Sequence, residues 1–206
     1  MNRADRRRTA PGKAKAQPKS RAWIIYGSIA LVLVGIVVAV AISSSTPPPL
    51  PAPQPVTLKI GSAAPEFQVS TDAGPFDLAA VKGKPVFLEV FATWCPHCQR
   101  ETVILNRLYD AYKDRVAFVA VSGHPLGMDR QSPESQADVM NFVQQFSVRY
   151  PVAFDPNLDV AHKYFQQGYP SIIVIGKSGT IKTIISGEAP ETQLTSSLDK
   201  ALAAPQ

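Results

Sequence analysis

Two cysteines separated by two residues are the groups of this 206-residue chain best suited to chemistry. They form the motif Cys95-Pro-His-Cys98, which follows an apolar run ending at Phe91 and precedes a stretch with helical periodicity. A first thiol at a helix N-terminus is stabilised as a thiolate, because free N–H groups and the helix macrodipole favour negative charge there. The thiolate is the nucleophile of disulfide exchange, and a thiol one turn later can attack the resulting mixed disulfide. The spacing therefore predicts a redox pair in which Cys95 attacks and Cys98 resolves.

A structural disulfide, half of a zinc site and a pair of inert buried thiols are the alternative uses of this motif. A disulfide that closes so short a loop stabilises a fold little in the chain-entropy model. Zinc needs further ligands, and the chain offers only His97, His124 and His162 besides the cysteines. We therefore expect no metal and no cofactor, and we assign His124 and His162 to structure or solvent.

Three neighbours of the cysteines are expected to tune the pair. Pro96 fits the first helical turn, where a missing N–H costs nothing. His97 can donate a hydrogen bond or positive charge to the Cys95 thiolate, which makes the disulfide more oxidising; alternatively it is a solvated histidine without influence. Trp94 is expected to shield the disulfide and to offer an apolar docking face, or else merely to pack.

The elements that must position this pair are predicted from the hydrophobic pattern of residues 57–206. Residues 85–91 are apolar on both faces, as is typical of a central strand covered on both sides, and residues 116–121 suit a second buried strand. Lys177-Ser-Gly179 is a turn signal that predicts a hairpin. The order of elements predicts the α/β class, a mixed sheet sandwiched by helices. The remaining predictions are a loop at 123–135, strands at 150–154, 171–175 and 180–185, and helices at 136–147, 157–165 (capped by Asn157) and 191–202.

The helix after Cys98 is predicted to bury one broad apolar stripe. The members of that stripe are Val103, Leu105, Leu108, Tyr109 and Tyr112.

The first part of the chain is predicted to place this domain outside the cytoplasm. Residues 22–42 form 21 uncharged, mostly apolar positions, and a helix of that length spans about 30 Å, the thickness of a bilayer core. The basic segment 1–21 precedes it, so the positive-inside rule predicts a single-pass protein with a cytoplasmic N-terminus. A cleaved signal peptide is the alternative, since Ala39-Val40-Ala41 resembles a cleavage site, but the apolar run exceeds a typical signal core. Residues 43–56 contain six prolines and are expected to form a semi-rigid linker to the domain 57–206.

Charge excludes nucleic acid as the expected partner. The net charge of +5 arises because residues 1–21 carry eight Lys or Arg and one acid, whereas the remaining 13 Lys or Arg meet 15 acids. The body of the chain is thus mildly acidic and lacks the basic footprint that nucleic-acid binding requires. The lipid bilayer, contacted through residues 22–42, is the expected partner of the basic and apolar segments.

The motif and its surroundings resemble a known family. Phe91-Ala-Thr-Trp-Cys-Pro-His-Cys98, with Glu101 and the later Tyr169-Pro170-Ser171, is similar to the thioredoxin superfamily, in particular to its membrane-anchored TlpA/ResA-like thiol–disulfide oxidoreductases. The likeness covers about residues 57–203 and implies a thioredoxin fold, a central mixed β-sheet flanked by helices. Weaker matches are Gly61-Ser-Ala-Ala-Pro-Glu-Phe67, Gly83-Lys84-Pro85 and Gly179.

The resemblance implies roles for four further residues. It implies a cis peptide bond between Tyr169 and Pro170, packed against the cysteines, with the backbone before the proline pairing with the substrate strand. Glu89 matches the buried acid that helps to deprotonate Cys98, and burial should raise its pKa as suits a general base; a register slip that exposes Glu89 is the alternative. Glu101 matches a glutamate that tunes thiol acidity, unless it is a surface residue paired with His97.

The predicted function is thiol–disulfide exchange with cysteine-containing exported proteins. The resemblance favours a reductant that keeps apocytochrome c or other exported cysteines reduced, supplied by a membrane redox partner. The Pro-His dipeptide also occurs in DsbA-type oxidants and favours the opposite direction. A thiol peroxidase is a further alternative, as is a copper chaperone of the SCO type with His162 or His124 as its histidine ligand.

Overall fold

The structure, a computed structural model, describes residues 57–204 together with Tyr26, Ile29, Leu31, Leu33 and Val34. Apart from those five, whose backbone is helical and whose side chains are exposed, the predicted segments 1–21, 22–42 and 43–56 lie outside the described residues. Within the part of the chain that is described, no helix is both long and apolar enough to cross a membrane. The membrane anchor stays a prediction.

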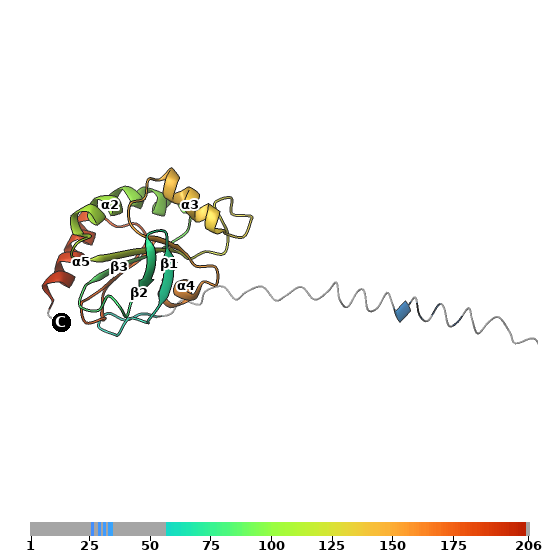
Figure 1. Ribbon diagram of the computed structural model, residues 1–206, viewed down its shortest axis with the longest axis horizontal. Helices are drawn as coiled ribbons and strands as arrows, with labels where there is room; N and C mark the ends of the chain where they lie inside the picture. The colour runs from blue at the N-terminus through green and yellow to red at the C-terminus, as the bar shows by residue number, and fades with distance from the viewer. Residues whose placement is uncertain (1–25, 27–28, 30, 32, 35–56, 205–206) are drawn as a thin grey trace, which may run out of the picture. The chain divides into compact units, whose positions relative to one another are not determined.

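The domain is built on one mixed, seven-stranded sheet with the strand order β2-β1-β5-β4-β3-β6-β7 (Figure 1). Parallel pairing joins β3 to β4 and β4 to β5, whereas β1 pairs antiparallel with β2 and β5, and β6 pairs antiparallel with β3 and β7. The strands are β1 (Gln68–Thr71), β2 (Gly74–Asp77), β3 (Val86–Phe91), β4 (Ala117–Ser122), β5 (Val152–Phe154), β6 (Ser171–Ile175) and β7 (Ile181–Ser186).

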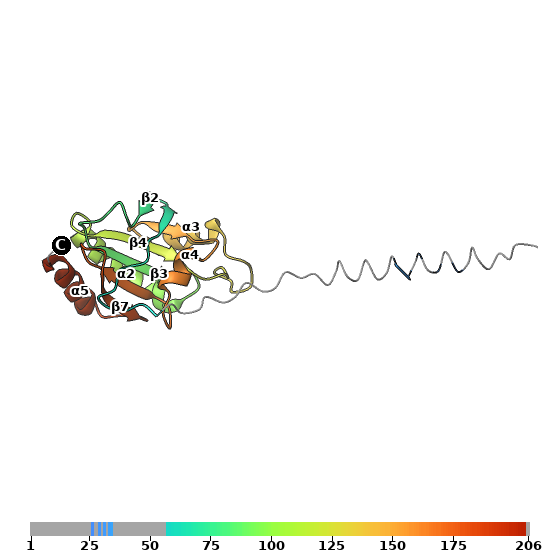
Figure 2. The ribbon, with the colours of Figure 1, turned by 90° about the horizontal axis from the view of Figure 1, so that it is seen from below.

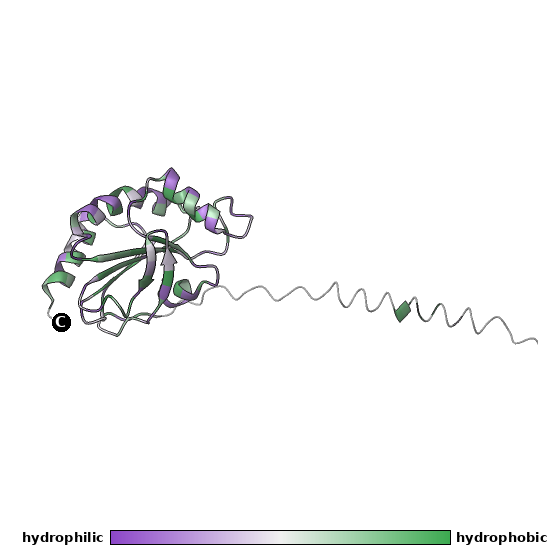
Figure 3. Ribbon diagram, in the orientation of Figure 1, coloured by the Kyte–Doolittle hydropathy of each residue, from purple (hydrophilic) through white to green (hydrophobic). Residues whose placement is uncertain are grey.

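Helices cover both faces of the sheet and create two apolar cores. On one face lie α2 (Pro96–Tyr112), α3 (Gln136–Gln145) and α5 (Glu191–Ala203), and on the other lies α4 (Asp159–Tyr164) (Figures 1 and 2). The hydropathy follows this arrangement, since the inner strands are hydrophobic while the helices alternate between hydrophobic and hydrophilic residues (Figure 3). The expected α/β sandwich with a mixed sheet is therefore confirmed.

The strand that leads to the cysteines is buried throughout. All six residues of β3 are buried, because the strand lies between β4 and β6 and is covered on both faces. Phe87 and Phe91 belong to the core beneath α2 and α5, while Leu88 and Val90 belong to the core that contains α4. Side chains alternate along a strand, so Glu89 points to the same face as Phe87 and Phe91, the face that carries the cysteines. The alternative of an exposed Glu89 is wrong.

One element of the sheet was missed by the sequence analysis, and two of its expectations of local structure are wrong. The hairpin β1–β2 was not predicted, because its strands are short, largely exposed and lack a clear alternation. Asn157 is not an N-cap: α4 begins after Leu158, and the carboxylate of Asp155 accepts the N–H groups at its start instead. Val103 is exposed, because polar residues of α2 (Glu101, Thr102 and Asn106) occupy the buried face that hydropathy assigned to apolar ones.

A close approach of backbone and side chains at Gly123 gives a stability prediction. A Cβ atom at Gly123 would lie 2.5 Å from Val90 Cγ1 and 3.0 Å from Ala161 Cβ, so β3 or α4 would have to move. We expect Gly123→Ala to lower the free energy of unfolding by about 1–3 kcal/mol, as overpacking does. Gly168→Ala is the matched control, since its nearest neighbour, Ser186 Oγ, is 3.5 Å away. Chemical denaturation measures both, and equal stabilities of the two variants would contradict the packing argument.

Candidate active site around the paired cysteines

The fold places Cys95 where β3 gives way to α2. After Phe91 the chain makes a turn, closed by a 3.0 Å hydrogen bond from the Cys95 N–H to the Ala92 carbonyl. Cys95 is the N-cap residue of α2 and Pro96 occupies the first turn, as expected from its missing N–H. Cys95 therefore sits at the positive end of a 17-residue helix.

The two thiols lie in contrasting environments although both are buried and unbridged. The pKa of Cys95 is lowered to about 6, chiefly by a hydrogen bond from the Cys98 thiol and then by the N–H groups of Cys98 and His97, against the opposing effect of burial. The pKa of Cys98 is raised, by burial first and then by the hydrogen bond to Cys95 and the nearby charge of Glu89. One thiol is thus prepared as a nucleophile and leaving group, and the other is held protonated until its proton is removed.

The segment before β6 contacts Cys95. The peptide bond between Tyr169 and Pro170 is cis, as the family resemblance implies. The Cys95 thiol lies 3.7 Å from the Tyr169 carbonyl oxygen, and the Tyr169 hydroxyl donates a 2.6 Å hydrogen bond to the Gly123 carbonyl. The contact between Cys95 and Tyr169 joins residues that are 74 positions apart in the sequence.

Glu89 lies beneath the pair as a buried acid. It is 2% exposed, and burial raises its pKa well above the ordinary value, with further upward effects from the charges of Glu101 and Cys95. The hydroxyl of Tyr150, which is also buried, donates a hydrogen bond of 3.4 Å to Glu89 Oε2. Glu89 therefore holds a proton more readily than an exposed glutamate, and it is close enough to Cys98 to influence the pKa of that thiol.

Glu101 is a second buried carboxyl, one turn beyond Cys98 on the buried face of α2. It is fully buried, and burial raises its pKa to about 7 although the N–H of Ala189 donates to both of its oxygens at 3.2–3.3 Å. The alternative of a surface Glu101 paired with His97 is wrong, because α2 turns Glu101 inward toward the segment before α5.

His97 points into solvent and has different partners. Its side chain is 59% exposed, and its Nδ1 lies 2.9 Å from Glu188 Oε2 and 2.7 Å from Arg100 Nη2. Arg100 also donates to both oxygens of Glu188, which together with His97 lowers the pKa of Glu188 to about 2. The positive charge of His97 is the smallest of the effects that lower the pKa of Cys95.

Trp94, directly before Cys95, is half-buried in a cluster of rings. Its indole N–H donates a 3.1 Å hydrogen bond to His124 Nδ1, and its ring makes edge contacts with His124 and Tyr169. The guanidinium carbon of Arg130 lies 4.6 Å from the ring centroid. Trp94 therefore packs and is also partly open to solvent.

Four residues at this site were not found from the sequence. They are Tyr150, Glu188, Glu134 and His124, and all four reach the site from other elements. The buried Glu89 in β3 requires a hydrogen-bond donor, but nothing in the sequence indicates that Tyr150 is this donor. Glu134 accepts hydrogen bonds from the hydroxyls of Thr93, at 2.9 Å, and Ser122, and burial raises its pKa to about 7.

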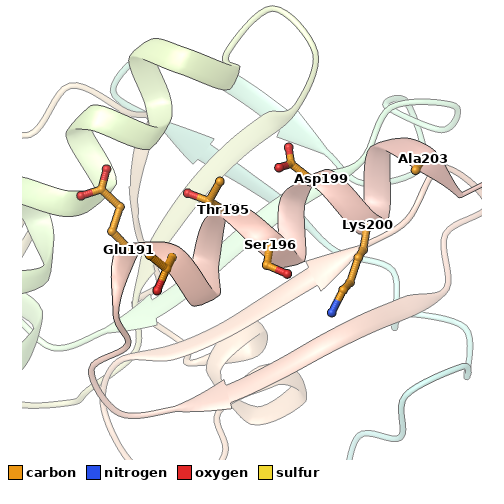
Figure 4. A pocket seen from close by; sticks show the side chains of 7 residues that line it. Glu191, Thr195, Ser196, Asp199, Lys200 and Ala203 are labelled. Atoms are coloured by element: carbon orange, nitrogen blue, oxygen red, sulfur yellow. The ribbon is translucent and has the colours of Figure 1, made fainter.

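Two further features of the described residues bear on the presence of another site. Among the described residues, no group of three or more His, Cys, Asp or Glu is arranged to hold a metal ion. A shallow hollow runs along the outer side of α5 and contains none of the residues discussed above (Figure 4). Its lining residues are Glu191, Thr192, Thr195, Ser196, Asp199, Lys200 and Ala203.

Known proteins resemble this chain in sequence and in fold. A family model described as Redoxin matches residues 59–202. The thiol-disulfide oxidoreductase ResA of Bacillus cereus is 33% identical over 145 residues, covering 69% of this chain and 79% of the relative, and the ResA of Geobacillus kaustophilus is 34% identical, covering 62% and 70%. The crystal structure of a putative thiol:disulfide interchange protein DsbE from Chlorobium tepidum superposes with a TM-score of 0.63 at 26% identity, covering 71% of this chain and all of the other.

Proposed function

Because this chain belongs to the Redoxin family and is a ResA-like thiol–disulfide oxidoreductase with a thioredoxin-like fold, we propose that it exchanges disulfides with exported proteins through Cys95 and Cys98. The proposed direction is reductive, from the cysteine pair to the disulfide of a client protein.

The observation that carries the proposal is the unequal preparation of the two thiols. Cys95 ionises near neutral pH at the start of α2, next to the cis Tyr169–Pro170 bond, while Cys98 stays protonated beside Glu89. An attacking thiol works best when its pKa lies near the ambient pH, which a pKa of about 6 satisfies.

In the proposed reaction the Cys95 thiolate attacks one sulfur of the client disulfide, and the other client sulfur leaves as a thiolate. Glu89 then takes the proton of Cys98, whose sulfur attacks Cys95 and releases the second client thiolate. Two electrons have moved to the client, and Cys95 and Cys98 have become a disulfide. Glu89 is the general base of this step.

The surrounding residues have supporting roles in this proposal. Pro170 and the Tyr169 carbonyl order the client strand next to Cys95, and Trp94 offers the apolar face on which it docks. Glu101, whose pKa of about 7 lies close to the working pH, tunes the acidity of the thiols. Pro96 keeps the first turn of α2 in its helical conformation.

Two observations favour a reductant over a DsbA-like oxidant. A lower thiolate pKa stabilises the reduced pair and makes its disulfide more oxidising, and the value of about 6 for Cys95 is nearer to that of thioredoxin, about 7, than to that of DsbA, about 3.5. The side chain of His97, the residue that favoured an oxidant, contacts Glu188 and Arg100, and its charge has the smallest of the effects that lower the pKa of Cys95.

We further propose where this exchange takes place. Residues 22–42 anchor the chain in the cell membrane with the N-terminus in the cytoplasm, and the proline-rich segment 43–56 holds the domain on the extracytoplasmic side. A membrane redox partner returns electrons to the pair after each cycle. The clients are exported proteins with cysteines, apocytochrome c among the candidates, and nucleic acid has no part.

The reduction potential of the Cys95–Cys98 pair tests the direction. The full chain is equilibrated in buffers of defined dithiol and disulfide ratio, and the reduced fraction is read from the mass added by thiol alkylation. We expect a potential near that of thioredoxin, about −270 mV, because Cys95 is only moderately acidic. A potential near that of DsbA, about −120 mV, would replace the reductant with the oxidant.

Replacing His97 with alanine is the companion measurement. We expect a change of less than about 30 mV, the equivalent of about one pKa unit, because His97 already interacts with Glu188. A larger change toward a more reducing potential would show that His97 sets the redox poise after all.

A further inference from the structure

The loop 123–135 reaches the turn before Cys95 with three side chains, although the proposed reaction gives the loop no part. Glu134 accepts a hydrogen bond from Thr93, His124 accepts one from Trp94, and Arg130 lies over the Trp94 ring. Thr93 and Trp94 are the two residues that immediately precede Cys95. The loop 123–135 therefore contacts the two residues next to the reactive sulfur of Cys95.

The loop has enough internal structure to hold these side chains in place. Leu126 pairs with Pro133 as an isolated bridge, and the Glu134 N–H donates to the Pro125 carbonyl at 2.9 Å. At its tip the carboxylate of Asp129 accepts hydrogen bonds from the N–H groups of Gln131 and Ser132. These bonds make the loop a formed element before any client arrives.

His124 has a defined tautomer in this arrangement. Its Nδ1 lies 3.1 Å from the Trp94 indole nitrogen and 3.0 Å from the Leu126 amide nitrogen. Both are N–H donors, and both lie nearer to Nδ1 than the one acceptor beside it, the Leu126 carbonyl oxygen at 3.4 Å. Nδ1 therefore carries the lone pair and the ring hydrogen lies on Nε2. Burial lowers the pKa of His124, which keeps the ring neutral as this arrangement requires.

The hydrogen bond controls the ring that borders the site. Trp94 makes an edge contact with Tyr169, with ring centroids 6.2 Å apart, and the Tyr169 carbonyl lies 3.7 Å from the Cys95 sulfur. His124 itself contacts Tyr169, at 5.9 Å between ring centroids. Trp94 therefore contacts His124, through the hydrogen bond, and Tyr169, and those two rings also contact each other.

We infer that His124 is a positioning residue: by accepting the indole N–H of Trp94 at Nδ1, it holds the Trp94 ring in the orientation that a docking client polypeptide meets beside Cys95. His124 acts through Trp94 and touches no reacting atom. The inference rests on the proposed function only in so far as the docking molecule is a polypeptide.

The test uses the full chain with Trp23→Phe, which leaves Trp94 as the sole tryptophan. His124→Leu removes the hydrogen-bond acceptor. His124→Asn keeps one, because asparagine Oδ1 is bonded to Cγ as histidine Nδ1 is. In His124→Leu we expect the Trp94 emission to shift to longer wavelength and KM for a disulfide-bonded protein to rise about threefold to tenfold, the factor that one net hydrogen bond represents. The kcat value, the reaction with oxidised glutathione and the reduction potential stay unchanged, and His124→Asn returns emission and KM toward the parent values.

His162→Leu is the matched control, because His162 lies on α4, the helix on the opposite face of the sheet, and is expected to change none of these quantities. Unchanged emission and KM in His124→Leu would overturn the inference. So would a folded His124→Asn variant that fails to rescue, or an equal loss toward oxidised glutathione, which would place the effect on the thiols.

A measurement on the unsubstituted chain decides the question if the variants do not fold. Nitrogen NMR of His124 should show an unprotonated, hydrogen-bonded Nδ1, and a protonated Nδ1 at neutral pH would overturn the inference. If the parent chain does not reduce protein disulfides, the proposed function fails, while the emission and the tautomer still decide whether His124 holds Trp94.

Discussion

Replacing Cys98 with serine is expected to leave the chain covalently joined to its clients. Cys95 keeps its place at the start of α2, and the serine hydroxyl can donate the hydrogen bond that the Cys98 thiol supplies in the parent chain, so Cys95 still attacks client disulfides. The mixed disulfide then has no internal thiol to resolve it, and turnover should fall to the background rate of small thiols in solution. Non-reducing electrophoresis and mass spectrometry of the full chain should show adducts approaching one client per chain, which disappear on reduction.

Two variants make this result specific. Cys95→Ser should form no adducts and lose all exchange, because a serine hydroxyl does not ionise near neutral pH. Cys95→Ser/Cys98→Ser should behave the same way. Adducts carried by Cys95→Ser would reverse the assignment of the attacking and resolving thiols, and the absence of adducts from Cys98→Ser would remove the resolving role from Cys98.

The order of strands and helices from β3 onward and the position of the pair could be predicted because they depend on local signals. The apolar run of β3, the Pro after Cys95 and the turn at Gly179 each specify their own conformation, and all three occur in the structure as expected. Gly179 adopts φ +76°, which a hairpin turn of this kind favours. The motif and the elements around it can therefore be predicted from the sequence.

The partners of the site residues could not be predicted, because they arrive from distant segments. Tyr150 meets Glu89 across 61 positions, and Ala189 meets Glu101 across 88. Hydropathy also placed Val103 on the buried face of α2 and treats a glutamate such as Glu101 as a surface residue. In the structure Glu101 is buried and Val103 is exposed. Glu101 is one of the buried polar residues of α2 and lies near the cysteines, where burial of a polar group can serve the chemistry at the expense of local preference.

Glu89→Gln is expected to slow the resolving step about a hundredfold or more while leaving the reduction potential nearly unchanged. Glutamine keeps the size of the side chain but cannot take the proton of Cys98, and general base catalysis contributes about 10²–10⁴-fold. The potential should change little, because a general base lowers the barrier of the resolving step without itself setting the relative stabilities of the dithiol and the disulfide. Stopped-flow measurement of client release from the mixed disulfide, across a range of pH, gives the rate.

The pH dependence separates a base from a structural residue. In the parent chain the base form of Glu89 grows as the pH rises through its raised pKa, so the resolving rate should rise with it; in Glu89→Gln that rise should be lost.

A glutamate with a raised folded-state pKa binds its proton more tightly in the folded than in the unfolded chain, so it makes the fold lose stability as the pH rises above about 4.3. Glu89→Gln should therefore lose less stability than the parent over that range, even as its resolving rate falls. Glu66 is an exposed carboxylate beside Lys82, so Glu66→Gln is the control that should change neither the resolving rate nor its pH dependence. A Glu89→Gln variant that kept the parent rate and pH profile would leave this buried carboxyl, and its hydrogen bond from Tyr150, with a role in packing alone.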